Sequence, residues 1–457
     1  MKETLKIGVS GVRGIVGESF TPQLAATFAQ AFGTFVGGET VLVGRDTRDS
    51  GRMIEPAVVA GLQSVGARPV LLGIVPTPSL LLAVKTWGAR GGIMITASHN
   101  NEEWNALKFV DRHGLFLDHP HAEELFDLYH QQDFPLVGES DLRTTGHRPD
   151  AVAVHFARVG AYVDVAAIRA ADLKVVVDCG NGVGALHTAT FLREVLGCRR
   201  VHTLYDAPTG RFERPPEPLP AHLGALRQAV LEQGADIGFA QDPDGDRLAA
   251  VAADGEPLGE ARTVALAVQA VLVHHAQGPV VVNFSATRAF DAVAAAAAVP
   301  LERTRTGEVH VTAAMRRNGA VAGGEHTGGI IIPGVHMCRD SYAGMAVLLE
   351  RMALTGQSVR ALDEALPRFY QQQMKITLAP DQAPQIMRRL RQAYAGHTCG
   401  HDDGLFVEWP DGWMHARRSN TEPVLRLIVE AATAEQAQAR LAECCELAGI
   451  HGGQSNS

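Results

Sequence analysis

Three aspartates that alternate along a turn are the first residues whose spacing suggests chemistry. Asp242, Asp244 and Asp246 lie in the run Gln-Asp-Pro-Asp-Gly-Asp-Arg, directly after a predicted strand at 236–239. Carboxylates packed this closely repel one another, and a bound cation is their natural counter-charge. All-oxygen ligation favours Mg²⁺ or Ca²⁺ over zinc. Arg247 follows at once and places a phosphate-binding group beside the cation. A solvated acidic turn is the alternative interpretation.

A serine follows another predicted strand. Ser98 stands near the end of the run Gly-Gly-Ile-Met-Ile-Thr-Ala-Ser-His-Asn at 91–100. Open α/β sheets bind their ligands at the carboxyl ends of strands. The Gly-x-Ser-x-Gly motif of a nucleophile elbow is absent. A serine can nevertheless carry a phosphoryl group if cations and hydrogen-bond donors stabilise the added charge of about −2. Arg13 and Lys108 are candidate cations, and a turn with side-chain-to-backbone hydrogen bonds is the alternative.

Two further loops could hold a phosphorylated sugar. The run Arg-Arg-Ser-Asn-Thr-Glu-Pro at 417–423 combines guanidinium, hydroxyl and amide groups that suit a phosphate dianion. The run Gly-Gly-Glu-His-Thr-Gly-Gly at 323–329 lets backbone approach a ligand closely. Glu325 and Thr327 within it could bind sugar hydroxyls. A polar hairpin and a glycine-rich turn are the respective alternatives.

One glycine-rich run points to a different cofactor. The run Gly-Asn-Gly-Val-Gly-Ala at 180–185 satisfies G-x-G-x-x-A, the nicotinamide-dinucleotide pattern. Asp178 and Cys179 separate it from the preceding strand, and an acid so close to the glycines would repel a pyrophosphate. Packing of a helix against a sheet is therefore the favoured use of these glycines.

Alternating strands and helices must position these loops. Such alternation predicts parallel α/β layers, and three rounds of it predict three similar α/β domains. The predicted strands are 40–43, 69–72, 92–96, 174–177, 200–204, 236–239, 279–284 and 301–305, and the helices are 53–62, 79–84, 183–195, 221–232, 262–274 and 286–298. The remaining chain predicts an antiparallel α+β domain, with strands at 374–378, 405–409, 413–416 and 424–429 and helices at 382–394 and 433–447.

Length and composition bound the protein class. A chain of 457 residues predicts several domains of about 100–150 residues each. The expected domains are 1–149 with the serine, 150–252 with the metal loop, 253–367 with the sugar loop and 368–457 with the phosphate loop. The formal net charge of −9 disfavours nucleic acid as a partner. No apolar run reaches membrane-spanning length, no secretory signal is evident, and the six cysteines are sparse. We expect a cytoplasmic protein with no nucleic-acid and no membrane partner.

Taken together, these loops resemble those of the α-D-phosphohexomutase family, which comprises phosphoglucomutase, phosphomannomutase and phosphoglucosamine mutase. The runs at 96–100, 242–247, 324–328 and 417–421 are similar to its phosphoserine, metal, sugar and phosphate loops. Shorter matches are Gly-Val-Arg-Gly at 11–14, Gly-Arg-Asp-Thr-Arg-Asp-Ser at 44–50, Val-Pro-Thr-Pro at 75–78 and Val-Asp-Cys-Gly-Asn-Gly at 177–182. All follow the family's order over nearly the whole chain, which makes the resemblance specific.

The resemblance implies a fold and an activity. The fold is three similar α/β domains and a C-terminal α+β domain around a central cleft. The activity is that of a Mg²⁺-dependent hexose phosphate mutase, an intramolecular phosphotransferase. It interconverts 6-phosphate and 1-phosphate sugars through a phosphoserine at Ser98 and a 1,6-bisphosphate intermediate. A hexose phosphate is the implied partner, hexose 1,6-bisphosphate the activator, and a monomer or homodimer the expected state.

The resemblance also assigns roles to residues of this sequence. The implied catalytic residues are Ser98, Lys108, Arg13 and Arg247, with Lys108 as the candidate general acid/base. The implied metal ligands are Ser98, Asp242, Asp244 and Asp246, the sugar-binding residues are Glu325 and Thr327, and the phosphate-binding residues are Arg417, Ser419, Asn420 and Thr421.

The chain departs from the family pattern in two places. The sugar loop of many bacterial members ends in a histidine proposed to transfer protons, and Gly329 stands there in this chain. The usual Asn-Gly before the lysine is Asn105-Ala106. The runs at 324–330 and 306–309 look more like the archaeal-type phosphoglucosamine mutase or phosphomannomutase/phosphoglucomutase branch, and these are the expected sugar specificities.

Two functions from other classes stand beside this hypothesis. One is a catalytically silent sugar-phosphate-binding regulatory protein of the same fold, which the intact serine, aspartates and arginine disfavour. The other is a nicotinamide-dependent dehydrogenase that uses the run at 180–185.

Overall fold

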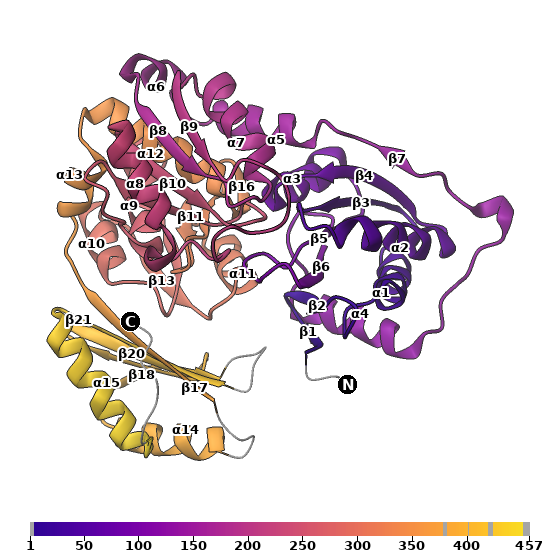
Figure 1. The fold of residues 1–457 in the computed structure, drawn as a ribbon. Helices are drawn as coiled ribbons and strands as arrows, with labels where there is room; N and C mark the ends of the chain where they lie inside the picture. Colours follow the sequence, from indigo (N-terminus) through magenta and orange to yellow (C-terminus); the bar gives the residue numbers. More distant parts are fainter. Residues whose placement is uncertain (1–3, 378–381, 401, 419–423, 451–457) are drawn as a thin grey trace. The chain divides into compact units, whose positions relative to one another are not determined.

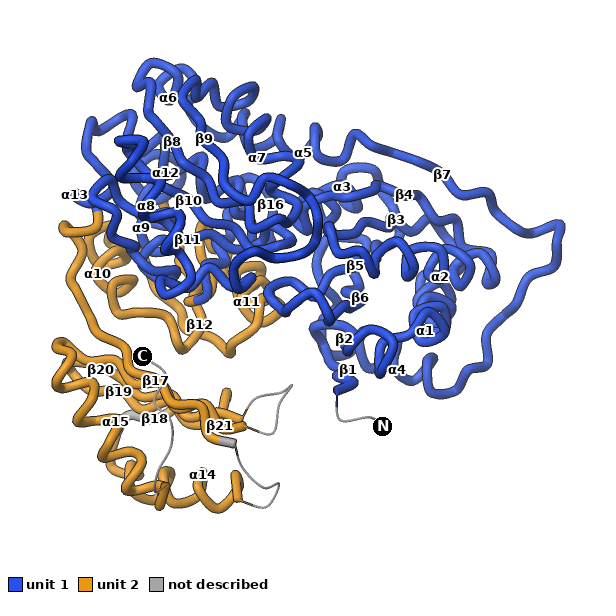
Figure 2. Tube along the Cα trace, in the orientation of Figure 1, with its two compact units in different colours: residues 1–276, 327–362 blue, residues 277–326, 363–457 orange. Residues whose placement is uncertain are grey.

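The computed structural model describes residues 4–377, 382–400, 402–418 and 424–450. The chain divides into two compact units, shown in blue and orange in Figure 2. Unit 1 comprises Met1–Ala276 and Thr327–Leu362, and unit 2 comprises Gln277–His326 and Asp363–Ser457. Ser419, Asn420 and Thr421, the predicted phosphate-loop residues, lie outside the described residues.

The first sheet of unit 1 is mixed and carries the serine loop (Figure 1). Its seven strands run in the order β1-β2-β6-β5-β3-β4-β7, with β3, β4 and β5 parallel and β6 antiparallel to β5. The strands are β1 Lys6–Gly8, β2 Gly11–Ile15, β3 Thr40–Arg45, β4 Arg68–Ile74, β5 Gly91–Ile95, β6 Trp104–Val110 and β7 Gly146–His147. The helices are α1 Pro22–Phe35, α2 Gly51–Ser64, α3 Thr77–Trp87 and α4 His119–Gln131.

Local sequence explains α1 and the core beneath it. The Thr21 hydroxyl accepts a hydrogen bond from the Leu24 N–H, and proline occupies the first helical position. Phe28 and Phe32 recur at helical spacing and are fully buried in the same core as β3 and β5. This core fixes the carboxyl ends of β3 and β5, where polar residues follow.

The second sheet of unit 1 carries the aspartate loop. Its order is β11-β10-β8-β9, with β8, β9 and β10 parallel and β11 antiparallel to β10. The strands are β8 Lys174–Asp178, β9 Arg200–Leu204, β10 Ile237–Gln241 and β11 Leu248–Ala252. The helices are α5 Ala151–Gly160, α6 Val165–Ala171, α7 Gly184–Thr190 and α8 Gly224–Gln233, and α7 continues into a π-helical turn at Phe191–Val195.

The chain after residue 259 contributes to both units. Unit 1 holds α9 Glu260–His274, the antiparallel pair β15 Ile330–Ile332 and β16 His336–Arg339, and α12 Ser341–Thr355. Unit 2 holds the parallel strands β12 Val280–Asn283, β13 Leu301–Thr304 and β14 Ala322–Gly324, with α10 Ala289–Ala296 and α11 Glu308–Asn318. The short helix α13 Val359–Glu364 leads out of this region.

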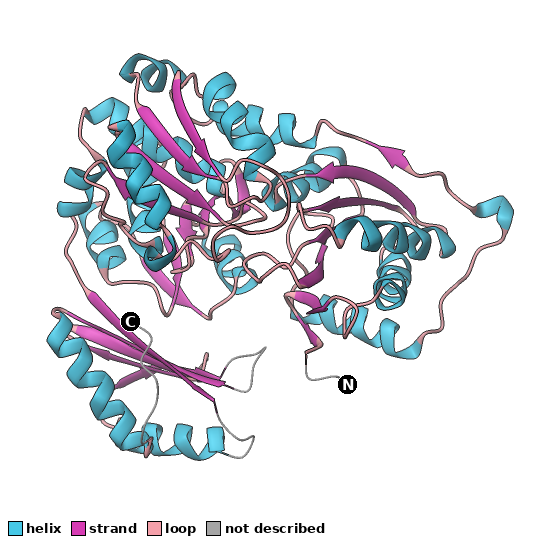
Figure 3. Ribbon diagram, in the orientation of Figure 1, coloured by secondary structure: helices cyan, strands magenta, loops and turns pink. Residues whose placement is uncertain are grey.

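The C-terminal part of unit 2 is an antiparallel sheet with two helices packed on it (Figure 3). The order is β17-β21-β20-β19-β18. The strands are β17 Tyr370–Thr377, β18 Thr398–Gly400, β19 Leu405–Trp409, β20 Gly412–Arg418 and β21 Val424–Ala431, and the helices are α14 Gln382–Ala393 and α15 Ala434–Ala448. The three α/β sheets and the terminal α+β sheet confirm the predicted fold class.

Among the described residues, no single helix is both long and apolar enough to cross a membrane. Helices α5 and α6 pass that test only as a pair, by length and composition, and they are bent by 81° at the break between them.

Candidate active site

Ser98 lies just beyond β5 on a loop that buried polar contacts hold in place. Its side chain is 3% exposed, and its φ of 49° puts a non-glycine residue in the left-handed region. The Ser98 N–H donates to the Thr96 hydroxyl at 3.0 Å, and that hydroxyl donates to Asp46 at 2.6 Å. Arg48 donates to the Ser98 carbonyl at 2.8 Å. The strained conformation is therefore held by its surroundings.

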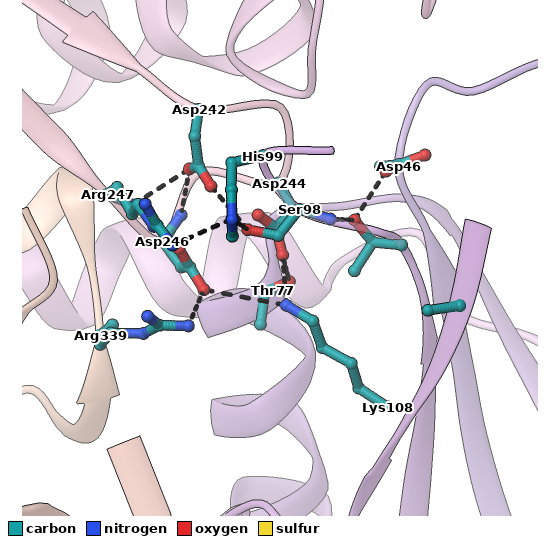
Figure 4. A network of polar contacts seen from close by, with 12 residues as sticks. Asp46, Thr77, Ser98, His99, Lys108, Asp242, Asp244, Asp246, Arg247 and Arg339 are labelled. Carbon is teal, nitrogen blue, oxygen red and sulfur yellow. Dashed lines mark hydrogen bonds and ion pairs between the residues drawn. The ribbon is translucent and has the colours of Figure 1, made fainter. Parts of the chain in front are cut away.

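The three predicted aspartate ligands form the tight turn between β10 and β11 (Figure 4). Asp242, Asp244 and Asp246 are fully buried, and each offers a carboxylate oxygen within 4.8 Å of the others. Asp242 Oδ1 accepts the N–H groups of Asp246 and Arg247, both at 3.1 Å. Ser98 Oγ donates to Asp242 Oδ2 at 2.9 Å. The structure thus brings the serine and the aspartates together from two different sheets.

Cations and a hydroxyl occupy part of the aspartates' bonding capacity. Lys108 Nζ lies 2.8 Å from Asp244 Oδ2 and 3.8 Å from Asp246 Oδ2. Thr77 at the start of α3 donates to Asp244 Oδ2 at 2.7 Å. Asp244 Oδ1 and Asp246 Oδ1 are buried and have no hydrogen-bond partner among the described residues. Buried, unpartnered carboxylate oxygens this close together fit a hard divalent cation.

Burial and mutual repulsion set the protonation of the turn. The pKa of Asp242 is raised well above its usual range by burial and then by Asp246 and Asp244. Burial is the largest effect on Asp244 and opposes its ionisation, but the charge of Lys108 together with the hydrogen bonds to Asp242, Lys108 and Thr77 holds the pKa of Asp244 well below its usual range. A cation bound between these carboxylates would offset the repulsion that raises the pKa of Asp242.

Two arginines and a histidine surround Ser98 on the other side. Arg13 donates to Asn100 Oδ1 at 2.7 Å, and Arg247 donates to Glu217 at 2.7 Å and to His99 Nδ1 at 2.9 Å. Burial, Arg247 and Arg13 lower the pKa of His99 well below its usual range. Burial and then Arg247 also lower the pKa of Arg13. His99 Nδ1 lies 3.4 Å from Ser98 Oγ, so a neutral imidazole faces the serine within a cluster of positive charge.

The predicted sugar and phosphate residues are divided between the units. Glu325 follows β14 in unit 2 and accepts the Gly307 N–H at 2.7 Å. Thr327 belongs to unit 1 and is half-buried. Arg417 lies on β20 in unit 2, also half-buried, and its pKa is lowered by burial against the opposing effect of Asp403. Its Nε has no hydrogen-bond partner among the described residues.

Gly329, the departure from the family pattern, has a neighbour that explains it. A Cβ at position 329 would lie 2.1 Å from Cδ of Arg339. The Arg339 guanidinium donates to Asp246 Oδ2 at 2.6 Å. Arg339 therefore fills the space that a side chain at 329 would need, and it adds a cation to the aspartate turn.

The glycine-rich run at 180–185 packs against the aspartate turn. A Cβ on Gly182 would lie 2.5 Å from the backbone of Pro243, and one on Gly184 would lie 2.6 Å from Gln241 Oε1. Asp178 is paired with Arg214 at 2.7 Å. The glycines thus allow two loops to pack closely, and packing is the use that the sequence favoured for them.

Several residues of the cluster had no role in the sequence prediction. Asp46, Arg48 and Thr77 lie in the shorter runs at 44–50 and 75–78. The position of these runs in the family's order is the sequence signal that could have identified the three residues. Glu217, Asp46 and Thr77 reach the cluster only through folding, across up to 167 positions of sequence in the case of Thr77 and Asp244. Arg339 stands 93 positions from Asp246 and lies in no quoted motif.

Comparison with known proteins identifies four family domains along the chain. Profiles of the phosphoglucomutase/phosphomannomutase alpha/beta/alpha domains I, II and III match residues 4–136, 153–255 and 260–370. The profile of the C-terminal domain of the same proteins matches residues 374–447. The four profiles follow one another in order along nearly the whole chain.

Individual proteins agree with the profiles. A protein of Methanopyrus kandleri named "Probable phosphoglucosamine mutase" is 37% identical over 94% of this chain and 95% of its own length. A "Phosphoglucomutase/phosphomannomutase" of Thermococcus kodakarensis is 34% identical, with the same coverage of 94% and 95%. The crystal structure of a phosphoglucomutase/phosphomannomutase family protein from Burkholderia thailandensis is 27% identical with a TM-score of 0.82, covering 98% of this chain and 99% of that chain.

Proposed function

This chain belongs to the phosphoglucomutase/phosphomannomutase family, and from that premise we propose that it is a Mg²⁺-dependent hexose phosphate mutase. It is an isomerase that interconverts 6-phosphate and 1-phosphate sugars through a phosphoserine and a 1,6-bisphosphate. The names of two relatives support a phosphoglucosamine mutase or a phosphomannomutase/phosphoglucomutase. The proposed enzyme is cytoplasmic and monomeric or homodimeric, with hexose 1,6-bisphosphate as its activator.

One contact carries this proposal. Ser98 Oγ lies 2.9 Å from Asp242 Oδ2, beside two buried carboxylate oxygens without hydrogen-bond partners among the described residues. In a solvated acidic turn, a hydroxyl that points at the carboxylates would have no particular role. The same placement is useful where the carboxylates bind a cation and the hydroxyl carries a phosphoryl group beside it. Asp242, Asp244 and Asp246, with Ser98, are therefore the proposed ligands of Mg²⁺.

The proposed chemistry is two phosphoryl transfers through one serine. In the first, the bond between phosphorus and Ser98 Oγ breaks while a sugar hydroxyl bonds to phosphorus, giving the bisphosphate. In the second, Ser98 Oγ loses its proton and bonds to the other phosphorus, while the bond between that phosphorus and its sugar oxygen breaks and the sugar oxygen takes up a proton. Bound Mg²⁺ supplies charge neutralisation for the phosphoryl oxygens. Arg13 and Arg247 offer guanidinium groups to the same oxygens, and Lys108 is the proposed general acid/base for the hydroxyl proton.

Recognition of the sugar and of its distant phosphate belongs to other residues. Glu325 and Thr327 are the proposed partners of the sugar hydroxyls, and Arg417 with Ser419, Asn420 and Thr421 is the proposed grip on the phosphate that is not being transferred. The domain limits 1–149, 150–252, 253–367 and 368–457 are proposed to divide these tasks among serine, metal, sugar and phosphate.

A coupled assay tests the proposal. Glucose, mannose, glucosamine and N-acetylglucosamine phosphates serve as substrates, with glucose 1,6-bisphosphate as primer and Ser98→Ala as the control. We expect primed turnover of at least one sugar, and none by the variant. Binding of sugar phosphates without turnover would instead establish a silent binding protein. A change in the absorbance of a reduced nicotinamide cofactor on mixing would favour the dehydrogenase.

A further inference from the structure

A buried serine, histidine and aspartate form a hydrogen-bonded chain outside the candidate active site. Ser79 Oγ on α3 lies 2.9 Å from His155 Nδ1 on α5, and His155 Nε2 lies 2.8 Å from Asp340 Oδ2. A neutral imidazole with its proton on Nε2 satisfies both ends, because Nε2–H donates to Asp340 and Nδ1 accepts from the Ser79 hydroxyl. The three residues are 0%, 1% and 2% exposed. No substrate can reach them, so they do not act as a hydrolase triad, although serine, histidine and aspartate are bonded in the same order.

The aspartate end of this chain is attached to the metal-binding turn. Asp340 caps α12, with Oδ1 accepting the N–H groups of Tyr342 and Ala343 at 2.9 and 3.2 Å. Both residues that flank it contact the turn. Arg339 donates to Asp246 at 2.6 Å, and Ser341 Oγ donates to the Gly245 carbonyl at 2.6 Å. The orientation of Asp340 therefore determines where two contacts to the turn are made.

The serine end reaches the same turn by a second route. Ser79 lies two residues after Thr77 on α3. The Thr77 N–H donates to the Asp244 carbonyl at 2.9 Å, and its hydroxyl donates to the Asp244 carboxylate at 2.7 Å. The N-terminal end of α3 thus holds Asp244, while Arg339 just before α12 holds Asp246 and Ser341 at the start of α12 holds Gly245. His155 connects the two helices.

We propose that His155 is a positioning residue that keeps the Asp242, Asp244 and Asp246 carboxylates in metal-binding geometry by fixing α3 and α12 to each other. The proposal rests on the proposed function, since it concerns the same Mg²⁺ site. Partners that orient metal ligands without touching the metal typically change its affinity about ten- to a hundredfold when removed. Among the described residues, the hydrogen-bond partners of His155 are Ser79 and Asp340, and its ring also lies edge-on to that of Tyr342 on α12, with the ring centroids 5.8 Å apart.

Two substitutions at position 155 each remove one of the two hydrogen bonds of the histidine. The amide of Gln at position 155 reaches about as far as Nε2 and keeps the bond to Asp340, whereas the shorter amide of Asn matches Nδ1 and keeps only the bond to Ser79. We expect His155→Asn and His155→Gln each to weaken Mg²⁺ binding about tenfold or more, because each variant leaves the side chain at position 155 attached to only one of the two helices. Ser79→Ala, a small change in volume, removes the same hydrogen bond as His155→Gln and should match it. His187→Asn is the matched control, since His187 Nε2 bonds the Ile74 carbonyl at 3.0 Å and ties α7 to β4 without touching α12.

The measurements are Mg²⁺ titration calorimetry and amide hydrogen exchange of a peptide spanning 241–247 in metal-free protein. The Asp246 and Arg247 amides, which donate to Asp242, should exchange faster in His155→Asn and at the wild-type rate in the control. Unchanged affinity and exchange in a folded His155→Asn or Ser79→Ala protein would overturn the proposal, as would equal defects in the control. If wild type binds no Mg²⁺ at all, the proposed function fails. The exchange rates would still decide whether the chain orders the turn.

Discussion

The cluster around Ser98 and the polar residues of unit 2 hold their charges in different ways. Around Ser98, the carboxylates, cations and hydroxyls are almost all buried and fixed by ion pairs or hydrogen bonds, Lys108 is 5% exposed, and Asp244 Oδ1 and Asp246 Oδ1 are the carboxylate oxygens of the turn left without a hydrogen-bond partner among the described residues. In unit 2, Arg417 is half-buried and its Nε lacks a hydrogen-bond partner among the described residues. The first arrangement suits atoms that must be in place before a reaction. The second leaves bonding capacity for a ligand that must be gripped and released.

Removing the serine breaks the first arrangement at its centre. Ser98→Ala deletes the oxygen that is proposed to carry the phosphoryl group, so we expect kcat to fall about 10⁴-fold or more. After exposure to a hexose bisphosphate, peptide mapping should find added phosphate on the peptide holding residue 98 in wild type only. Ser64→Ala, in which a hydroxyl at the end of α2 is lost, serves as the control. Activity that survives in Ser98→Ala would end the assignment.

Removing the buried lysine tests whether the cluster needs its pairing. Lys108→Met keeps the apolar stem but leaves Asp244 and Asp246 without their nearest ammonium. Breaking a buried ion pair typically costs about 3–5 kcal/mol, so metal-free protein should lose that much stability against denaturant. Mg²⁺ should raise the stability of wild type and variant alike. The exposed Lys85→Met is the control, and an unchanged denaturation midpoint for Lys108→Met would refute this account.

A carboxyl at the edge of the cluster should make stability depend on pH. Burial raises the pKa of Glu260 from 4.5 to about 7, and its Oε1 has no hydrogen-bond partner among the described residues. Because its pKa is raised in the folded state, Glu260 contributes stability that is fully present below pH 4.5 and is lost as the pH rises through 7. The free energy of unfolding of Glu260→Gln should therefore rise relative to that of wild type over this pH window, by up to about 3 kcal/mol at pH 8.

Chemical denaturation of wild type and Glu260→Gln at several pH values measures this difference. The exposed Glu256→Gln, whose residue pairs with Arg227, should show no such divergence. A constant difference between Glu260→Gln and wild type across the window would mean that Glu260 does not ionise within it.

Removing the arginine of unit 2 should give the smallest effect, and it should act on ligand binding. A charged hydrogen-bond partner typically contributes about 1.5–3 kcal/mol, or roughly ten- to a hundredfold in affinity. Arg417→Ala should raise KM by that factor and release free bisphosphate during turnover, so that the enzyme needs added bisphosphate to stay active. Arg388→Ala, exposed on α14, is the control. Equal KM and equal leakage in Arg417→Ala would show that this side chain does not hold the phosphate.

Local signals were sufficient for the elements and for the loops after them. The predicted strand at 200–204 matches β9, and the helix at 53–62 lies within α2. Hydrophobic periodicity decides such segments because burial of one face is a local property of sequence. The predicted helix at 183–195 stops being α-helical after Thr190 and continues as a π-helical turn, which no residue pattern indicated.

Contacts between distant segments were beyond the same reasoning. The aspartate turn and the serine loop could each be recognised by its residue types, but the bond from Thr77 to Asp244 spans 167 positions. Arg339 carries no motif, and its approach to Asp246 depends on the missing side chain at Gly329. Such contacts follow from the packing of separate sheets, which a single sequence specifies only through the whole fold.

The left-handed backbone of Ser98 limits which amino acid can serve as a carrier at that position. Threonine has the same hydroxyl and accepts phosphate equally well, yet its second Cβ substituent makes a φ of 49° costly. The contacts of Thr96 and Arg48 prevent the loop from relaxing to a conformation that would suit threonine. Of the two amino acids with an aliphatic hydroxyl, the backbone at position 98 therefore accommodates serine and disfavours threonine.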